Sequence, residues 1–131
     1  MNLKRSSVKR VLVGFLVVLF LCAGAMGILR HQIQSGLDQW CATAQAAHPH
    51  PGDAVAAMLD YVQSETHSLR DRNYVVWALG QARDPRALPV LDGYVTGEPC
   101  NHDERLCEGE LNKAIALCQG DTPNPLCIRT P

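Results

Sequence analysis

The feature that most constrains this chain is an uninterrupted run of 19 residues without a charge, from Val11 to Leu29 (VLVGFLVVLFLCAGAMGIL). As an α-helix with a rise of about 1.5 Å per residue, such a run spans roughly the thickness of the hydrocarbon core of a bilayer. Four basic residues precede the run, whereas only Arg30 follows it before Arg70. Because basic residues favour the cytoplasmic side, we predict a single-pass protein of the bacterial inner membrane. Its N-terminus would be cytoplasmic and its C-terminal domain periplasmic or otherwise extracytoplasmic.

The same run leaves open a cleaved signal peptide. Residues 11–22 would then be its apolar region, and Ala23-Gly24-Ala25 its small-residue cleavage site. The apolar run continues past that site to Leu29, which favours an uncleaved transmembrane helix. A lipoprotein fits the sequence less well, because Leu21 rather than a small residue precedes Cys22.

The near-neutral net charge of −1 conceals two parts of opposite sign. The chain has five basic and no acidic residues up to Arg30, but 7 basic and 13 acidic residues from His31 to Pro131, a net charge of −6. An acidic body lacks the basic surface that binding to phosphates requires, so we expect no nucleic-acid partner. Its roughly 100 residues are enough for one small core and no second domain.

Cysteine spacing favours disulfides in the exported part. Four cysteines lie in the C-terminal third of the chain: Cys100, Cys107, Cys118 and Cys127. A dense cluster in a small extracytoplasmic domain is typical of disulfide bonds, with buried free thiols as the alternative. Cys107 and Cys118 lie about 16 Å apart if they share one helix, too far for a bond between them. We therefore predict one disulfide from Cys100 to Cys107 and one from Cys118 to Cys127. The crossed pairing would have to span the helix, and Cys41 is left over.

Apolar periodicity and capping residues predict an all-α body. The apolar stripe beyond Arg30 has helical spacing, so we expect the first helix to continue until the segment 48–52, which contains two prolines and a glycine. Four further helices are expected, each after a residue that caps helix N-termini: Asp53, Ser68, Asp84 (followed by Pro85) and Asp103. The helix after Asp84 is expected to extend through Tyr94 and Val95, and the helix after Asp103 to carry Cys107 and Cys118 on its apolar face. Gly120 is placed to end the last helix. No segment alternates with period two long enough to form a strand.

Two segments of the body resemble each other. They are Ala78-Leu79-Gly80-Gln81 and Ala116-Leu117-Cys118-Gln119, and an Asp and a Pro follow each of them closely. The offset between the two segments corresponds to a repeat period of between 30 and 40 residues. Such a period with two helices per unit is typical of a helical solenoid, in which neighbouring units bury each other's apolar faces.

Residues 73–91 resemble a HEAT-like repeat of the short bacterial, PBS-lyase type, whose core reads A-L-G-x-x-x-D-P-R-A before an apolar helix. The residues that match this signature are Ala78, Leu79, Gly80, Asp84, Pro85 and Arg86. The resemblance implies that Asp84 caps a helix and that Arg86 joins a ladder between adjacent repeats. It also implies an interaction scaffold, although it indicates the fold better than the function.

Together these features predict an all-α protein with a single N-terminal transmembrane helix followed by a short α-hairpin, HEAT-like solenoid. We divide the chain into a basic N-terminus, a transmembrane helix, a juxtamembrane helix with its linker, helical repeats and a disulfide-tethered tail. Their ranges are 1–10, 11–29, 30–52, 53–120 and 121–131.

Histidines in two places are candidate metal ligands. His48 and His50 flank Pro49 and could hold a transition metal weakly, but we interpret this segment as a rigid turn. His102 lies between Cys100 and Cys107, in a spacing without the paired C-x2-C geometry of zinc sites. We therefore expect no metal site.

The charged clusters of the body have a structural interpretation. The acids Asp103, Glu104, Glu108 and Glu110 are interpreted as a solvated helix face rather than as catalytic groups. The arginines are interpreted as partners in salt bridges between repeats rather than as an anion site: Arg70, Arg72, Arg83 and Arg86. The sequence has no nucleophile turn, no glycine-rich phosphate loop and no redox C-x-x-C pair. We expect no catalytic residue, no cofactor and no small-molecule substrate.

Two functions remain as hypotheses. The first is a membrane-anchored, extracytoplasmic protein–protein interaction module, such as an accessory subunit or adaptor of a cell-envelope complex. Its partners would be a protein in or at the membrane and, through residues 11–29, the lipid bilayer itself. The alternative is an exported inhibitor or immunity-type protein that binds an envelope-active enzyme.

Overall fold

The computed structural model describes residues 3–120, with side chains from residue 8 onward. All regular elements in this range are helices, as predicted. The chain forms two compact units, Met1–Ile33 and Gln34–Pro131. Residues 121–131, including Cys127, lie outside the described part.

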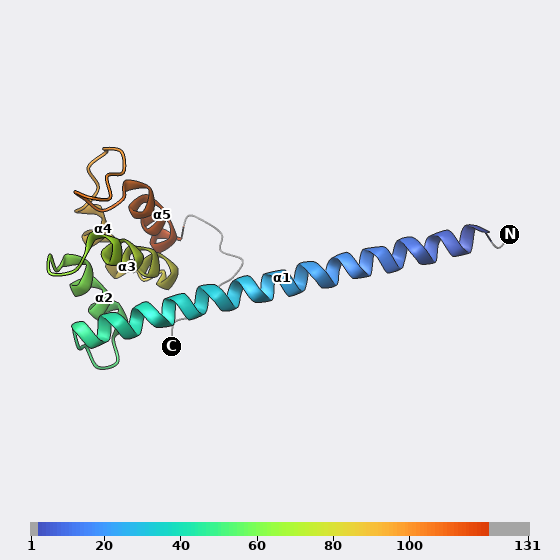
Figure 1. Cartoon of the computed structure of the whole chain (residues 1–131), viewed down its shortest axis with the longest axis horizontal. Helices are drawn as coiled ribbons and strands as arrows, with labels where there is room; N and C mark the ends of the chain where they lie inside the picture. The colour runs from blue at the N-terminus through green and yellow to red at the C-terminus, as the bar shows by residue number, and fades with distance from the viewer. Residues whose placement is uncertain (1–2, 121–131) are drawn as a thin grey trace. The chain divides into compact units, whose positions relative to one another are not determined.

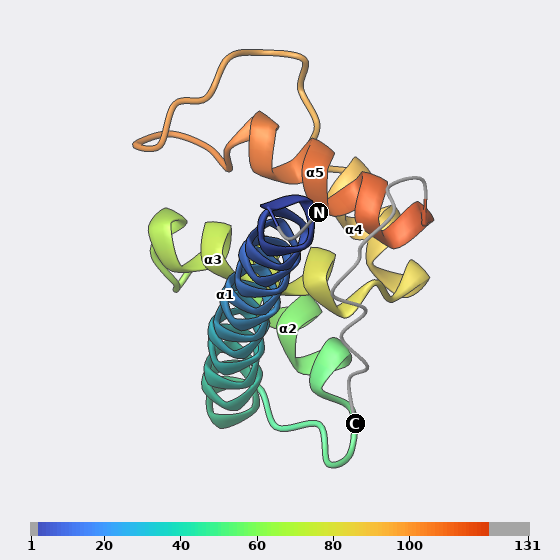
Figure 2. The same ribbon diagram turned by 90° about the vertical axis from the view of Figure 1, so that its right-hand side faces the viewer.

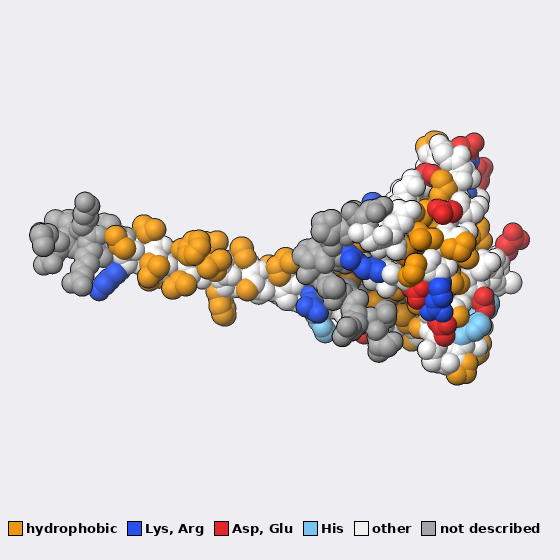
Figure 3. Space-filling view, turned by 180° about the vertical axis from the view of Figure 1, so that it is seen from behind, with side chains coloured by type: hydrophobic (Ala, Val, Ile, Leu, Met, Phe, Trp, Pro, Cys, Tyr) orange, Lys and Arg blue, Asp and Glu red, His pale blue; other side chains and the backbone are white. Residues whose placement is uncertain are grey.

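The first unit is the N-terminal part of α1 (Leu3–Ala47). Its apolar segment is long enough to cross a membrane, and none of that segment is buried. Hydrophobic side chains cover the helix on the side that Figure 3 shows. This helix has the length and composition of a membrane anchor or a signal sequence. As predicted, it does not end at Arg30.

The second unit contains the end of α1 and the remaining helices. These are α2 (Ala54–Gln63), α3 (Leu69–Ala82), the short 3-10 helix η1 (Pro85–Ala87), α4 (Leu88–Asp92) and α5 (Glu108–Gln119). Helix α3 packs against both α2 and α5, and α4 packs against α5 (Figures 1 and 2). The arrangement makes α3 the central helix of the unit.

Three of the predicted N-caps are confirmed. The side chain of Asp53 accepts a hydrogen bond from the backbone N–H of Ala56 at 3.0 Å. Ser68 accepts one from Asp71 at 3.1 Å, and Asp84 accepts one from Arg86 at 2.9 Å. These bonds satisfy amide groups that have no partner within their own helix. Gly120 ends α5 in the left-handed conformation, with φ of 76°, as predicted for a C-terminal glycine.

The prediction that Asp103 caps the last helix is wrong. Helix α5 begins at Glu108, after a turn in which the carbonyl of Asn101 accepts the amides of Glu104 and Arg105. The helix start is fixed from α3 instead, because Asn73 Oδ1 accepts the backbone N–H of Cys107 at 2.8 Å. A contact between residues 34 positions apart cannot be inferred from local capping patterns.

Two related expectations need correction. Cys107 precedes α5 rather than lying on its apolar face. The helix predicted after Asp84 is also shorter than expected, because α4 ends at Asp92 and Tyr94 and Val95 lie beyond it. At this end the amides of Tyr94 and Val95 bond to carbonyls three residues back, which is the hydrogen bonding of turns.

The core of the second unit lies among α1, α2, α3, α4 and α5. Its largest fully buried side chains include Leu37, Met58, Leu79, Leu91 and Leu111. The approach of α5 to α3 depends on Gly80, where an added Cβ would lie 2.8 Å from the Cα of Ala114. A real Cβ atom would clash at this distance, so the close approach of the two helices requires a glycine at residue 80.

Candidate functional site

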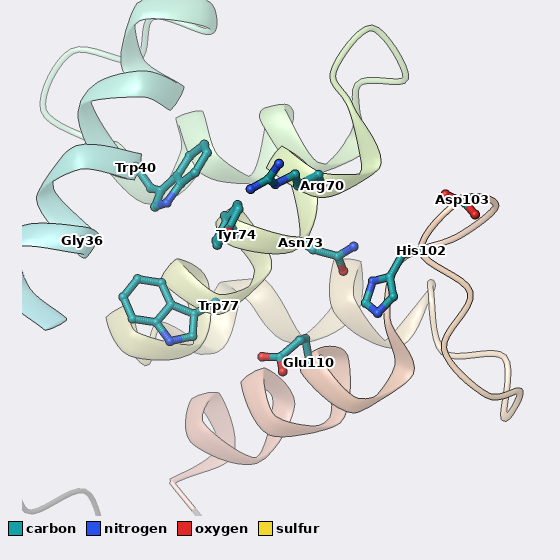
Figure 4. A pocket seen from close by; sticks show the side chains of 9 residues that line it. All are labelled: Gly36, Trp40, Arg70, Asn73, Tyr74, Trp77, His102, Asp103 and Glu110. Atoms are coloured by element: carbon teal, nitrogen blue, oxygen red, sulfur yellow. The ribbon is translucent and has the colours of Figure 1, made fainter.

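An open groove with a volume of about 790 Å³ lies in the second unit (Figure 4). Helix α3 contributes side chains with the spacing of one helix face, from Arg70 through Tyr74 to Trp77. The other lining residues come from α1, α5 and the loop before α5: Gly36, Trp40, Glu110, His102 and Asp103, with Asn73 of α3 completing the set. The groove therefore joins three helices and one loop.

Three aromatic side chains form the apolar part of this groove. Trp40 and Tyr74 stack with ring centroids 5.2 Å apart and an interplanar angle of 13°. Tyr74 is 44% exposed, while both tryptophans are half-buried. An added Cβ at Gly36 would lie 3.2 Å from the Trp77 ring, so this glycine allows the indole to lie against α1. We call this groove the aromatic groove and define it by the side chains of Trp40, Tyr74, Trp77 and Arg70.

The polar lining residues differ in what they already bind. Both ends of the Asn73 amide are engaged, since its Nδ2 donates to the Leu69 carbonyl and its Oδ1 accepts the Cys107 N–H at the start of α5. Glu110 pairs with Lys113 at 2.9 Å. By contrast, the described residues give the guanidinium of Arg70 neither a hydrogen bond nor an ion pair. Its charge is available to a ligand.

The residues of the repeat signature lie outside this groove, where they hold helices together. Ala78, Leu79 and Gly80 are buried near the end of α3. Arg86 contacts Asp84 at 2.8 Å and Asp53, the N-cap of α2, at 2.6 Å. Hydrogen bonding by Arg86 lowers the pKa of Asp53 to about 2 and lowers the pKa of Asp84 as well. The two carboxylates in turn raise the pKa of Arg86.

The other three arginines of the predicted set do not form salt bridges with described residues. Arg72 is buried, and its Nε donates to the Val62 carbonyl at 2.7 Å. Arg83 ends α3 with φ of 56°, and its Nε and Nη2 are buried without a partner among the described residues. Within the described range, Arg86 therefore forms the predicted salt bridge, and Arg70, Arg72 and Arg83 do not. That this salt bridge joins adjacent repeats stays a prediction.

A disulfide joins Cys100 and Cys107, whose Cα atoms lie 4.6 Å apart. This is the first predicted pair. The second pair includes Cys127, which lies outside the described residues, and it stays a prediction. Cys118 is buried, its thiol donates to the Leu79 carbonyl at 3.5 Å, and burial raises its pKa to about 11.

Cys41 lies in a second hollow of about 460 Å³ between the end of α1 and the starts of α2 and η1. Its sulfur lies 4.0 Å from that of Met58. Burial, and secondarily the nearby Asp38 carboxylate, raise the pKa of the thiol. A protonated thiol is a poor nucleophile, so this hollow offers no activated cysteine.

The histidines of the 48–52 turn point to different partners. His48 Nε2 lies 2.9 Å from His67 Nε2, whereas His50 Nε2 lies 2.6 Å from a carboxylate oxygen of Asp60. The two side chains therefore do not converge on one ion. Among the described residues, no group of three or more His, Cys, Asp or Glu could hold a metal.

These features define an all-α protein with a long apolar N-terminal helix and a small, disulfide-containing helical body. Comparison with protein-family models, curated proteins and solved structures finds no match to the chain. The disulfide is typical of an extracytoplasmic location.

The aromatic groove was not predicted from the sequence, in which Trp40 and Trp77 stand out only as members of apolar helix stripes. The available signal was that Arg70, Tyr74 and Trp77 share one helical face. That Trp40 of α1 stacks on Tyr74 could not be read from spacing, because it depends on how α1 packs on α3.

Proposed function

We propose that this protein is a membrane-attached, extracytoplasmic protein–protein interaction module and that its partner binds in the aromatic groove. The observation that carries the proposal is the gathering of two tryptophans, a tyrosine and an arginine without an ion pair to any described residue in one open groove. Tryptophan, tyrosine and arginine are the residues most enriched at the energetic centres of protein interfaces.

The arrangement of helices supports a short HEAT-like solenoid as the scaffold. The N-caps Asp53 and Asp84 open two successive helix pairs, and Arg86 bridges them. In a repeat architecture, equivalent caps of adjacent units lie side by side and are tied by such contacts. The units would be α2 with α3 and η1–α4 with α5.

The N-terminal helix and the disulfide support the membrane location. An anchor confines the module to the envelope surface, where an accessory subunit or adaptor would meet its complex. If instead the chain is cleaved after Ala25, the same groove would serve a soluble inhibitor or immunity-type protein. N-terminal sequencing of the mature protein, with extraction by alkali against detergent, separates these two proposals.

The test of the groove compares two truncations of exposed side chains. Tyr74→Ala removes an aromatic wall of the groove, while Val95→Ala truncates an exposed apolar residue that does not line it. We expect Tyr74→Ala to reduce recovery of a cross-linked partner from membranes at least tenfold, as loss of an interface centre does. Val95→Ala should leave recovery unchanged. Equal recovery with both variants would refute the groove as the binding site.

A further inference from the structure

The position of the aromatic groove in the chain limits which partner can reach it. This inference rests on the proposed function and concerns the chemistry and location of the partner. Gly36, which lines the groove, follows Leu29, the last residue of the apolar run, by seven residues. Seven residues span at most about 25 Å even when fully extended. If the apolar run is an anchor, the wall of the groove at Gly36 cannot lie farther than that from the bilayer surface.

A second constraint comes from charge. No Lys or Arg occurs between Arg30 and Arg70, so Arg70 is the first cation of the exported chain after the one that borders the apolar run. It is also the cation that lines the groove. Glu110, across the groove, has Lys113 as a partner at 2.9 Å, whereas Arg70 is unpaired within the described residues. Asp103 also lacks an ion pair among the described residues, but it lies on the loop before α5, away from the aromatic rings (Figure 4). Arg70 shares a helix face with Tyr74 and Trp77, so the unmet charge beside the rings is positive and favours a carboxylate of the partner.

Membrane-spanning proteins contain segments that could bring both an apolar and an acidic side chain to this groove. Extracytoplasmic flanks of membrane-spanning helices are poor in Lys and Arg, and aromatic residues are enriched where such helices leave the bilayer. A flank of this kind could place an apolar side chain against Trp77 and Tyr74 and an acidic side chain against Arg70. Helix-in-groove binding uses such anchors on one helix face.

We propose that the aromatic groove binds the acidic, extracytoplasmic juxtamembrane segment of another membrane-spanning protein. The binding would take place alongside the anchor of this chain. A soluble protein or an envelope glycan could also contact aromatic side chains, but neither would depend on the distance between the groove and the membrane.

That dependence provides the test. The full-length protein carries a photo-cross-linking amino acid in place of Gln39, an exposed residue beside Trp40. In one version, six EAAAK repeats are inserted between Arg30 and His31, a semi-rigid helical spacer of about 45 Å. In the matched control, the same repeats precede Met1. We expect cross-links in the flank that directly adjoins a span of an integral membrane protein, reduced at least tenfold by the inserted spacer and unchanged in the control.

Charge variants of Arg70 sharpen the test. Arg70→Glu should reduce cross-linking more than Arg70→Gln, and the cross-linked segment should contain Asp or Glu. Thermal unfolding of each variant serves as the control for folding, because substitution of this exposed residue should leave the body folded. An unchanged or stronger signal with Arg70→Glu would overturn the proposed chemistry.

Failure of the juxtamembrane inference can be distinguished from failure of the proposed function. If Tyr74→Ala abolishes cross-linking but the spacer does not, the groove binds a protein and the juxtamembrane inference is wrong. If neither change affects cross-linking, the proposed function fails as well. A mature N-terminus at Met26, or cross-links to glycan alone, would overturn the inference directly.

Discussion

The two helix pairs of the body begin alike and are completed differently. Both open with an aspartate N-cap, Asp53 or Asp84, and Arg86 contacts both of these residues. In the first pair, the ten residues of α2 connect to α3 through the short loop 64–68. In the second, α4 has only five residues, and the much longer loop 93–107 leads to α5. The second pair thus has less helix to bury and more chain to order.

The disulfide lies where this difference is greatest. Cys100 and Cys107 close part of the long loop, next to the start of α5. Closing a loop covalently lowers the entropy of the unfolded chain, which offsets the cost of ordering residues that make few buried contacts. The comparison indicates that the first pair depends on non-covalent contacts alone, whereas the second combines such contacts with a covalent constraint.

The largest expected loss of stability comes from truncating a buried side chain in the core of the second pair. Leu111 is fully buried on α5, and Leu111→Ala should lower the free energy of unfolding by about 2–5 kcal/mol, through lost burial and a residual cavity. Met58→Ala makes the matching change in the first pair. Urea unfolding followed by Trp40 and Trp77 fluorescence measures both. A loss below about 1 kcal/mol for Leu111→Ala would show that α5 is not part of the cooperative core.

The next effect should distinguish the pairs. Replacing both Cys100 and Cys107 by Ser removes the covalent loop and should cost about 2–3 kcal/mol. Amide exchange should accelerate in residues 93–107 and at the start of α5, while α2 and α3 keep their protection relative to global unfolding. Uniform acceleration throughout the body would contradict the division of roles between the pairs.

A somewhat smaller loss is expected at the contact between the pairs. Gly80→Ala places a Cβ 2.8 Å from the Cα of Ala114, so the two helices must separate, at a cost of about 1–3 kcal/mol. The double variant Gly80→Ala, Ala114→Gly should not recover the full loss, because the nearest obstructing atom belongs to the backbone. Full recovery in the same urea titration would mean that only the Ala114 methyl limits the approach.

The smallest effect concerns the Asp53–Arg86 contact, which is exposed to solvent. Because Arg86 lowers the pKa of Asp53 to about 2, the folded state favours the ionised carboxylate. The stabilisation is therefore present above the ordinary range of an aspartate and is lost as the pH falls from about 4 to about 2. Arg86→Gln should lower the unfolding midpoint slightly at pH 6 and much less at pH 2. An equal difference at both values would exclude this ion pair as the cause.

Local signals in the sequence predicted more of the fold than of the site. The caps Asp53, Ser68 and Asp84 were predictable because each bonds an amide within three residues. The start of α5 was not, since Asn73 determines it from another helix. The similar segments 78–81 and 116–119, near the ends of α3 and α5, are farther apart in the sequence than the caps Asp53 and Asp84 are. The reason is that the second helix pair has the longer loop. The Trp40–Tyr74 stack depends wholly on tertiary packing.

Arg72 gives the fold a means of rejecting wrong arrangements. It is the buried charged side chain of the described residues, at 8% exposure. Its guanidinium bonds to the Val62 carbonyl near the end of α2 and lies 3.4 Å from the Tyr94 hydroxyl beyond α4, with the Tyr94 ring 5.6 Å away. A slip of either helix by one residue would leave a cation in the interior without these neutral partners, at a cost of several kcal/mol. Arg72 therefore specifies how the ends of the two helix pairs align. It raises the free energy of misaligned arrangements more than it lowers that of the native one.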